Sequence, residues 1–390
     1  MKPESMVVQD AITGERQRLV WRPGGLVSRS PLATAIEPEW WLAPPLFDVQ
    51  INGFAGVDFQ QDDPEESDLL RAVRGLRAAG CTRFLPTLIT DDWSRLTRRL
   101  RAFKRCRDDC VELRRAMVGW HLEGPFLSDQ PGYHGAHDPA LMLDPRPEHL
   151  RELRAIVGTD PLLLTLAPER TGAIEAIRLA RQLGFVVSLG HTNASAVVLA
   201  EAVAAGASGF THLGNACPQH LDRHDNILWR VLETAGLHVS LIPDGLHVAP
   251  PLFRLLHRLL PAEALLYTTD AMSAAGSPPG RYRLGGWTLE VGEDGVVRQP
   301  GGSNFAGSSL TPVAGVFRAA TALKEAWVRS WRRFSVTPAH WLGMSSIVAP
   351  ERRTDFCLVN VTRDGALAAL RVFVAGEECL HGRENLVDGK

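Results

Sequence analysis

Short apolar segments alternate with longer amphipathic segments over most of the chain, from about residue 46 to residue 270. The short segments are rich in aliphatic and β-branched residues, as in buried strands, whereas the longer ones repeat apolar residues at helical spacing. The pattern predicts strands at 46–52, 82–88, 117–123, 162–168, 185–191, 209–213, 238–244 and 265–270. It predicts helices between them, among them 67–80, 93–106, 173–184 and 194–206.

Eight successive strand and helix repeats close naturally into a (β/α)8 barrel, so the predicted fold class is an α/β TIM barrel. An open, doubly wound sheet is the alternative. The glycine-rich fingerprint GxGxxG, which marks the first turn of dinucleotide-binding sheets of that kind, does not follow the first predicted strand.

The two ends of the chain do not follow the repeat. Residues 1–44 and 346–390 contain short strand-like pieces separated by turn residues, such as RQRLVWRPGGLV and FCLVNVT. We expect both ends to form one small β-sandwich domain, with the catalytic barrel at 45–345. The stretch 276–305 is rich in glycine and proline and is interpreted as a β-hairpin inserted after the eighth strand.

The composition and charge indicate which kind of molecule the protein binds. With 390 residues, 45% of them hydrophobic and 22% charged, the chain has the make-up of a globular protein. Its formal net charge of −2 produces no general attraction for nucleic acid or for an anionic membrane. No signal-peptide segment or run of about 20 apolar residues is visible. We therefore expect a cytoplasmic protein that binds small molecules.

Reactive side chains cluster at the predicted strand ends. In a (β/α)8 enzyme the chemistry takes place at the carboxyl ends of the strands, where the loops diverge from a rigid barrel. Polar residues stand there in strands 1, 3, 5, 6, 7 and 8, namely Asp48, Gln50, Asn52, Glu123, His191, His212, Asp244, His247 and Asp270. Since side chains of a strand alternate between its faces, Asp48, Gln50 and Asn52 share one face. Polar groups are tolerated mainly inside the barrel mouth, so we expect these residues to converge.

Three of these residues suit a metal ion. Glu123, His191 and His212 supply one oxygen and two imidazole nitrogens, a set that binds first-row divalent ions and leaves positions for water. Each residue alone could be a buried side chain satisfied by hydrogen bonds. Their occurrence at three strand ends, each beside a glycine or threonine, favours a site for one divalent ion per subunit. Zn²⁺ is the first choice, and ions of iron, cobalt or manganese also suit this set.

Asp270, in TTDA, would face this ion from the eighth strand. A carboxylate beside a water molecule can take its proton as a general base and later give it to a leaving group. A capping aspartate is the alternative. His137 and His247 lie on the loops after strands 3 and 7, where each is either a substrate contact or an ordinary surface histidine.

Several blocks resemble one family closely, the N-acetylglucosamine-6-phosphate deacetylases of the amidohydrolase superfamily. They occur in order between residues 46 and 312: FDVQINGFAGVDF, GCTRFLPTLIT, HLEGPFLSDQPGYHGAH, LAPE, SLGHTNAS, THLGNACP, PDGLHV, TTDAMSAAG and AGSSLTP. The resemblance implies a metal-dependent hydrolase of the amidohydrolase barrel type. Its reaction would be the release of acetate from N-acetylglucosamine 6-phosphate, which leaves glucosamine 6-phosphate.

The resemblance also implies roles for individual residues. Glu123, His191 and His212 match the metal ligands of the family, and Asp270 matches its catalytic aspartate. His137 matches a histidine that helps to polarise the amide carbonyl. The positions that match substrate-binding residues are Ala136, Asn215, Ala216 and His247.

Arg223, in HLDRHDN, falls where the family carries an arginine that reaches the substrate phosphate in the neighbouring subunit. The planar guanidinium can make two hydrogen bonds to phosphate oxygens. The resemblance therefore implies a homodimer, and a solvated surface arginine is the alternative.

The chain departs from many amidohydrolases at the first strand. A His-x-His pair commonly holds a second metal there, whereas this sequence has Gln50 and Asn52. Amides are poor substitutes for imidazole, so one metal per site is expected. Cys217 stands where the family has methionine, and we expect this change to be neutral.

Two other classes of protein and a second sugar are alternatives to this function. A two-metal hydrolase of cyclic amides needs a carbamylated lysine at a strand end, but the lysines, at 2, 104, 324 and 390, lie outside the predicted strands. A sugar-phosphate-binding protein without activity would be expected to lose Asp270 or a metal ligand, and all four are present. N-acetylgalactosamine 6-phosphate stays an alternative substrate, since it differs only in stereochemistry at one carbon.

Overall fold

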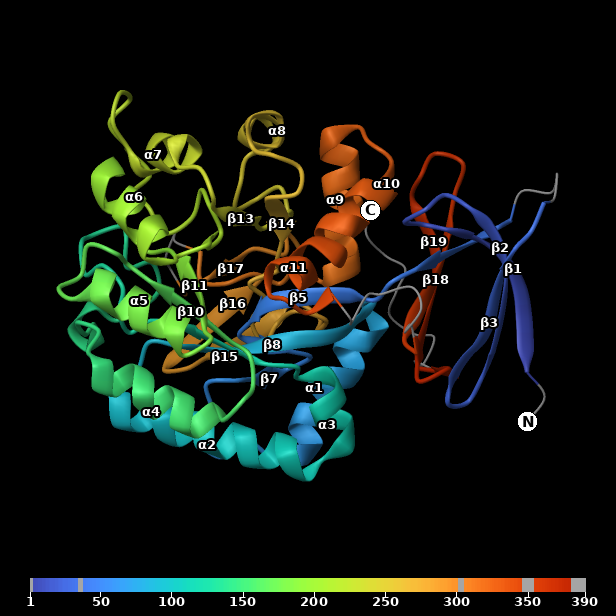
Figure 1. Ribbon diagram of the computed structural model, residues 1–390, viewed down its shortest axis with the longest axis horizontal. Helices are drawn as coiled ribbons and strands as arrows, with labels where there is room; N and C mark the ends of the chain where they lie inside the picture. Colours follow the sequence, from blue (N-terminus) through green and yellow to red (C-terminus); the bar gives the residue numbers. More distant parts are fainter. Residues whose placement is uncertain (1–2, 34–37, 301–304, 346–353, 380–390) are drawn as a thin grey trace.

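Eight parallel strands form the central sheet of the molecule, in the order β5-β8-β9-β10-β11-β12-β13-β14 (Figure 1). The computed structural model describes residues 3–33, 38–300, 305–345 and 354–379. The strands are β5 (Leu46–Ile51), β8 (Cys81–Ile89), β9 (Trp120–Glu123), β10 (Leu162–Leu166), β11 (Val186–Leu189), β12 (Gly209–Phe210), β13 (His238–Leu241) and β14 (Leu265–Tyr267). The sheet curls into a barrel, which confirms the predicted fold class.

Six of the eight barrel strands end earlier than the hydrophobic pattern predicted, whereas β9 ends where predicted and β8 ends one residue later. The pattern carried the fifth and eighth strands to His191 and Asp270, whereas β11 ends at Leu189 and β14 ends at Tyr267. Both His191 and Asp270 have a φ of 51°, which lies in the left-handed region and is incompatible with a strand. At His191 and Asp270 the chain therefore leaves the hydrogen-bonded ladder of the barrel strands.

Helices cover the outside of the barrel (Figure 1). They are α1 (Glu66–Ala78), α2 (Trp93–Asp109), α3 (Val111–Ala116), α4 (Pro147–Val157), α5 (Ala173–Gln182), α6 (Ala196–Ala205), α7 (Ile227–Glu233), α8 (Pro250–Leu259), α9 (Pro312–Leu323), α10 (Trp327–Arg333) and α11 (Val336–Trp341). None of these helices is long and apolar enough to cross a membrane.

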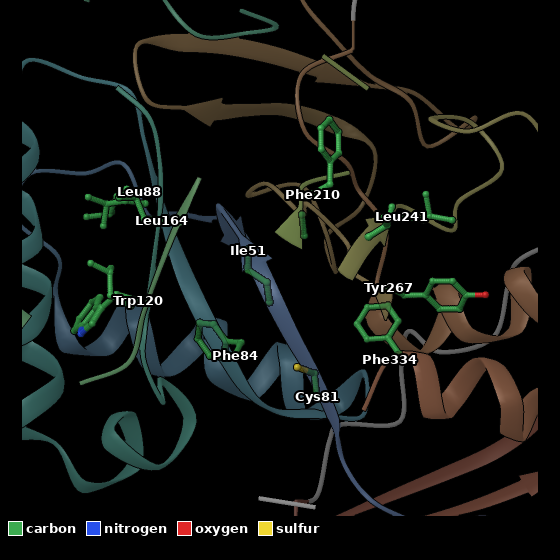
Figure 2. Close-up of a cluster of buried hydrophobic side chains, with 14 of the residues drawn as sticks. Ile51, Cys81, Phe84, Leu88, Trp120, Leu164, Phe210, Leu241, Tyr267 and Phe334 are labelled. Carbon is green, nitrogen blue, oxygen red and sulfur yellow. The ribbon is translucent and has the colours of Figure 1, made fainter. Parts of the chain in front are cut away.

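The second helix shows how the sequence specifies these elements. Asp92 caps α2, because its carboxylate accepts hydrogen bonds from the backbone N–H groups of Ser94 and Arg95. Leu96, Leu100 and Phe103 recur at helical spacing and are fully buried. Such faces pack onto the barrel in one large hydrophobic cluster, part of which is drawn in Figure 2 around Ile51, Phe84, Leu88, Trp120 and Leu164.

A histidine lies in the barrel interior below the mouth. His121 on β9 places Nδ1 3.1 Å from the hydroxyl of Thr87 and Nε2 2.8 Å from that of Thr165. The Thr165 hydroxyl lies 2.9 Å from that of Thr211. Burial lowers the pKa of His121 to about 4. A neutral imidazole therefore links three barrel strands through their threonines.

The two chain ends form a separate sheet, seen in blue and red at the right of Figure 1. Its strands are β1 (Glu4–Asp10), β2 (Arg16–Arg22), β3 (Gly25–Pro31), β4 (Trp40–Ala43), β18 (Phe356–Val361), β19 (Leu367–Val374) and β20 (Glu377–Glu378). They are ordered β20-β19-β18-β4-β1-β2-β3. The predicted second segment also includes residues 346–353 and 380–390, which lie outside the described residues.

This sheet folds over itself as a sandwich does. The ring of Trp21 on β2 lies 5.8 Å from that of Phe356 on β18 and 5.5 Å from that of Phe373 on β19. Two strands, β4 and β1, separate β18 from β2 in the sheet order. A flat sheet would hold these aromatic rings about 14 Å apart at the usual strand spacing, so the sheet must curl until its two halves face each other.

A small antiparallel sheet lies between β14 and α9 in the sequence. β15 (Gly280–Leu284) pairs with β16 (Trp287–Val291), which pairs with the short β17 (Val297–Arg298). The carboxylate of Asp58, at the end of β7 (Val57–Asp58), accepts a hydrogen bond of 2.8 Å from the N–H of Gly285 in the hairpin turn. This contact attaches the hairpin to the barrel.

The partly buried Asp58 makes part of the stability depend on pH. Burial raises the pKa of its carboxyl to about 6 from an ordinary value of 3.8. Between these values the folded protein binds more protons than the unfolded chain, so the free energy of unfolding decreases as the pH rises from 4 to 6. Asp58→Asn removes this titration. Between pH 4 and pH 6 we therefore expect the free energy of unfolding to decrease by about 2 kcal/mol more in wild type than in the variant.

Urea unfolding at pH 4, 5 and 6 would measure this difference. Asp63→Asn, at an exposed aspartate of the same segment, controls for the loss of one negative charge. If the free energy of unfolding changed equally with pH in wild type and in Asp58→Asn, the expectation would be contradicted.

Candidate active site

A cavity of about 450 Å³ opens at the carboxyl ends of the barrel strands. Ten of the residues singled out from the sequence line it, namely Asn52, Glu123, Ala136, His137, His191, His212, Asn215, Ala216, His247 and Asp270. Gln50 is buried beside them and contacts two of the carboxylates. The fold thus brings together residues that are separated by more than 200 positions in the chain.

Glu123, His191 and His212 form a tight, buried cluster. Glu123 Oε1 lies 2.8 Å from Nε2 of His212 and 3.3 Å from Nε2 of His191. One ligand atom from each residue lies within 4.8 Å of the others. One carboxylate oxygen and two imidazole nitrogens at these separations can surround a single divalent cation.

The orientation of His191 provides a further test of this fit. Its Nδ1 lies 3.0 Å from the carbonyl oxygen of Tyr133, which can only accept a hydrogen bond. Nδ1 therefore carries the proton, and in the neutral ring Nε2 presents its lone pair to Glu123. Two acceptors facing each other need a positive charge between them, so this arrangement fits a metal ion.

Burial and the neighbouring charges determine the protonation states. Burial opposes the ionisation of Glu123, but its contacts with the imidazoles of His137, His191 and His212 hold its pKa well below the ordinary value. Burial lowers the pKa of His191 to about 4. Burial opposes the charge on His212 as well, yet its shorter contact with Glu123 raises its pKa. An ionised carboxylate and a neutral imidazole are the forms that bind metals.

Asp270 stands opposite this cluster and is held by the amides of the first strand. Its Oδ1 accepts hydrogen bonds of 2.7 Å from Asn52 Nδ2 and 3.0 Å from Gln50 Nε2. The same amide group of Gln50 donates to Glu123 Oε1 over 2.9 Å. Burial, and next the negative charge of Glu123, raise the pKa of Asp270 to about 6. A cation bound by Glu123 would lower the pKa of Asp270.

Three of the polar residues adopt a strained backbone conformation. His191, His212 and Asp270 have φ angles of 51°, 37° and 51°. Non-glycine residues in this region cost about 1 kcal/mol or more each and persist where the surrounding structure holds them. Such strain gathered at one barrel mouth is typical of a functional site.

His137 and His247 each have one ring nitrogen anchored by a residue outside the cluster. Nδ1 of His137 lies 2.8 Å from the hydroxyl of Thr90, and Nδ1 of His247 lies 2.6 Å from Oδ2 of Asp244. Nε2 of His137 lies 3.7 Å from Oε2 of Glu123, and Nε2 of His247 is left for a group in the cavity. Asp244 was one of the polar strand-end residues, but Thr90 was missed, and its position at the end of the second strand is the signal that could have found it.

Comparison with known proteins places the chain in a family. The chain is 32% identical over 364 residues to an N-acetylglucosamine-6-phosphate deacetylase of Bos taurus, covering 90% of this chain and 82% of that protein. It belongs to the N-acetylglucosamine-6-phosphate deacetylase family. An N-acetylgalactosamine-6-phosphate deacetylase of Escherichia coli O157:H7 is 31% identical, over 86% of this chain and 87% of that protein. No protein-family model matches the chain.

A solved member of this deacetylase family has the same fold. A mutant N-acetyl-D-glucosamine-6-phosphate deacetylase of Mycobacterium smegmatis, in complex with N-acetyl-D-glucosamine-6-phosphate, matches with a TM-score of 0.84 at 29% identity. The match covers 97% of this chain and 100% of that one. The enzyme of Thermotoga maritima, at 24% identity and a TM-score of 0.81, supports the fold. The amidohydrolase barrel and the sheet from the chain ends are thereby confirmed, and the metal dependence of the family agrees with the buried cluster.

Two further features concern the surroundings of the cavity. Arg223 is exposed outside the cavity, and its Nε donates to Nε2 of the neighbouring His224 over 2.9 Å. Leu284 of the hairpin and Phe305 line the cavity, although no sequence motif indicated either residue. The ring of Phe305 lies 5.2 Å from that of His247.

A larger cavity, of about 1000 Å³, lies between α8, α9 and the turn that joins β18 to β19. Within the described ranges, Glu123, His191 and His212 are the only three residues that form a candidate metal cluster. The chemistry of a deacetylase therefore belongs to the smaller cavity at the barrel mouth.

Replacing Glu123 with glutamine tests the cluster as a metal centre. The amide keeps the shape but lacks the negative charge, so we expect the metal content of purified Glu123→Gln to fall about tenfold or more below wild type. Elemental analysis of protein purified without chelator measures this. His134→Gln is the matched control, since His134 lines the cavity but lies outside the cluster. Unchanged metal content in Glu123→Gln would count against the site.

Proposed function

We propose that this protein hydrolyses the acetamide of N-acetylglucosamine 6-phosphate to acetate and glucosamine 6-phosphate. The observation that carries the proposal is the buried Glu123, His191 and His212 cluster facing Asp270 at the mouth of a barrel of the deacetylase family. The named relatives and the substrate complex of the Mycobacterium smegmatis enzyme support this choice of substrate.

Glu123, His191 and His212 would hold one divalent cation, with Zn²⁺ the first choice. When bound, the cation supplies a Lewis acid that polarises the amide carbonyl and makes water a stronger acid. Gln50 and Asn52 donate to the carboxylates through their amide nitrogens. This use of the first strand supports a single-metal site, because the amide of Gln50 already bridges Glu123 and Asp270.

Asp270 is the general base and then the general acid. Both amide donors contact Oδ1, so Oδ2 is the oxygen that takes the proton from water as the water attacks the amide carbon. The proton then passes from Asp270 to the sugar nitrogen, which leaves as an amine.

His137 stabilises the negative charge that develops on the carbonyl oxygen. The hydroxyl of Thr90, 2.8 Å from Nδ1, can donate to that nitrogen. In this tautomer Nε2 carries the proton and donates to the oxygen. A donor aimed at a developing oxyanion in a site without bulk water commonly lowers the activation barrier by about 3 kcal/mol.

The sugar would contact the rest of the cavity wall. Ala136, Asn215, Ala216 and His247 are the proposed substrate-binding residues. Arg223 is exposed and does not line the cavity of its own chain, so we propose that it binds the phosphate of a substrate in the second subunit of a homodimer.

N-acetylgalactosamine 6-phosphate is a second candidate substrate. Relatives from Escherichia coli O157:H7 and Shewanella that are named for this sugar are each 31% identical to the chain, close to the 32% of the Bos taurus enzyme.

Replacing Asp270 with asparagine should abolish most of the turnover. The amide cannot take a proton, so we expect kcat to fall roughly 10²- to 10⁴-fold while the metal content stays at the wild-type level. The assay is acetate release from N-acetylglucosamine 6-phosphate with and without chelator. Asp364→Asn, at an exposed turn of the small sheet, serves as the control. Turnover by Asp270→Asn comparable to wild type would disprove the acid–base role.

Replacing Arg223 with alanine should weaken recognition of the phosphate. Loss of a charge-assisted contact is expected to raise KM for the 6-phosphate by roughly 10- to 100-fold and to leave the unphosphorylated sugar unaffected. Kinetics with N-acetylglucosamine and N-acetylgalactosamine, each with and without 6-phosphate, measure this and identify the preferred sugar. Arg178→Ala, on the exposed face of α5, controls for the loss of charge. If Arg223→Ala kept the phosphate preference of wild type, the phosphate would have another partner.

A further inference from the structure

Asp48, in the first barrel strand, is a fully buried carboxylate that takes no part in the proposed chemistry. It accepts four hydrogen bonds, from the N–H of Gln50 (3.1 Å), the hydroxyl of Thr268 (2.5 Å), and both the N–H (3.0 Å) and the hydroxyl (2.6 Å) of Thr269. Burial raises its pKa to about 6, so it is ionised at neutral pH. Its charge is balanced by four neutral donors rather than by a cation.

These bonds join the first and last strands of the barrel. β5 and β14 are the two ends of the eight-stranded order and share no ladder. Past the end of β14, Ile51 forms an isolated bridge with Ala271, and the N–H of Asn52 donates to the carbonyl of Ala271 over 2.7 Å. The side chain of Asp48 therefore supplies hydrogen bonds where the backbone of the strands supplies few.

The same bonds hold the backbone on both sides of Asp270. The N–H of Thr269, which precedes Asp270, donates to Asp48 Oδ2. The Thr269 hydroxyl also donates to Oδ2, and it accepts from the N–H of Ala271, which follows Asp270, over 3.1 Å. Asp270 itself has a φ of 51°. A left-handed aspartate persists where its surroundings hold it, and here both neighbouring N–H groups are held.

Asp48 also holds the backbone of Gln50, whose side-chain amide contacts Asp270. Its Oδ1 accepts from the N–H of Gln50, whose side-chain amide contacts Asp270 Oδ1. One buried carboxylate thus fixes the main chain beneath the catalytic aspartate and beneath one of the amides that orient it.

We propose that Asp48, acting through Thr269, is a positioning residue that keeps Asp270 in its left-handed conformation and aims its carboxylate into the cavity. The kinetic part of this inference rests on the proposed function, in which Asp270 transfers the proton. Asp48 and Thr269 lie outside the residues that line the cavity, so their effect is on turnover and not on substrate affinity.

A matched pair of variants at Thr269 tests this inference. Thr269→Val keeps the shape of the side chain but removes the hydroxyl that links Asp48 to Ala271, whereas Thr269→Ser keeps the hydroxyl. We expect Thr269→Val to lower kcat by about 10- to 100-fold with KM changed less than about threefold, since small displacements of a catalytic group cost about this much. Thr269→Ser should stay within about threefold of wild type.

Asp48→Asn provides a second, independent test of the inference. Its amide nitrogen faces hydrogen-bond donors, and this variant can fail to fold for that reason, so the Thr269 pair alone is sufficient for the test. Where Asp48→Asn folds, the double variant with Thr269→Val should be no slower than the slower single variant, because both changes break one connected unit.

Crystal structures of wild type, Thr269→Val and Thr269→Ser provide the readout that does not depend on activity. In Thr269→Val the φ of Asp270 should leave the left-handed region, and the wild-type contact of 2.7 Å between Asp270 Oδ1 and Asn52 Nδ2 should lengthen. Metal content should equal that of wild type. An unchanged Asp270 conformation in Thr269→Val, or a serine variant as slow as the valine variant, would overturn the inference. If wild type released no acetate, the proposed function would fail, and the crystallographic comparison would still decide the positioning role.

Discussion

The buried carboxylate of Glu123 is the interaction on which the site depends. It is shared by two imidazoles that come from different strands, and it lies among side chains with almost no access to water. An ionised carboxylate in such a place is stable only when positive charge or hydrogen-bond donors surround it. The barrel supplies donors on one side through Gln50 and His137, and it leaves the other side, between His191 and His212, for a cation.

The strand ends explain how a regular barrel can present these groups. A continuous strand would point alternate side chains towards the helices, and its last residue would follow the ladder. His191, His212 and Asp270 instead turn into the left-handed region just after their strands. The cost of this conformation is offset by hydrogen bonds from neighbouring strands and loops, such as that from the N–H of His212 to the hydroxyl of Ser240. Strain and function coincide because the same residues terminate the strands and face the cavity.

Three imidazoles of the site, those of His137, His191 and His247, are oriented by partners outside the metal cluster. The carbonyl of Tyr133 orients His191, Thr90 orients His137, and for His247 the partner is Asp244, three residues away, within one turn. These contacts decide which ring nitrogen faces the cavity, and so they decide whether a histidine can bind a metal or donate to an oxygen.

The sequence by itself determined the barrel, the sheet built from both chain ends and the residues that gather at the mouth, because alternating apolar segments and polar strand ends are local patterns. The Gln50 and Asn52 pair also indicates from the sequence alone that the first strand lacks imidazoles. Only the tertiary structure decided that Thr90 anchors His137, that Phe305 reaches His247 and that Asp48 joins the first strand to the last. The physical reason is that these contacts are made across the closed barrel by side chains far apart in the chain, and no local spacing or periodicity encodes a distance of that kind.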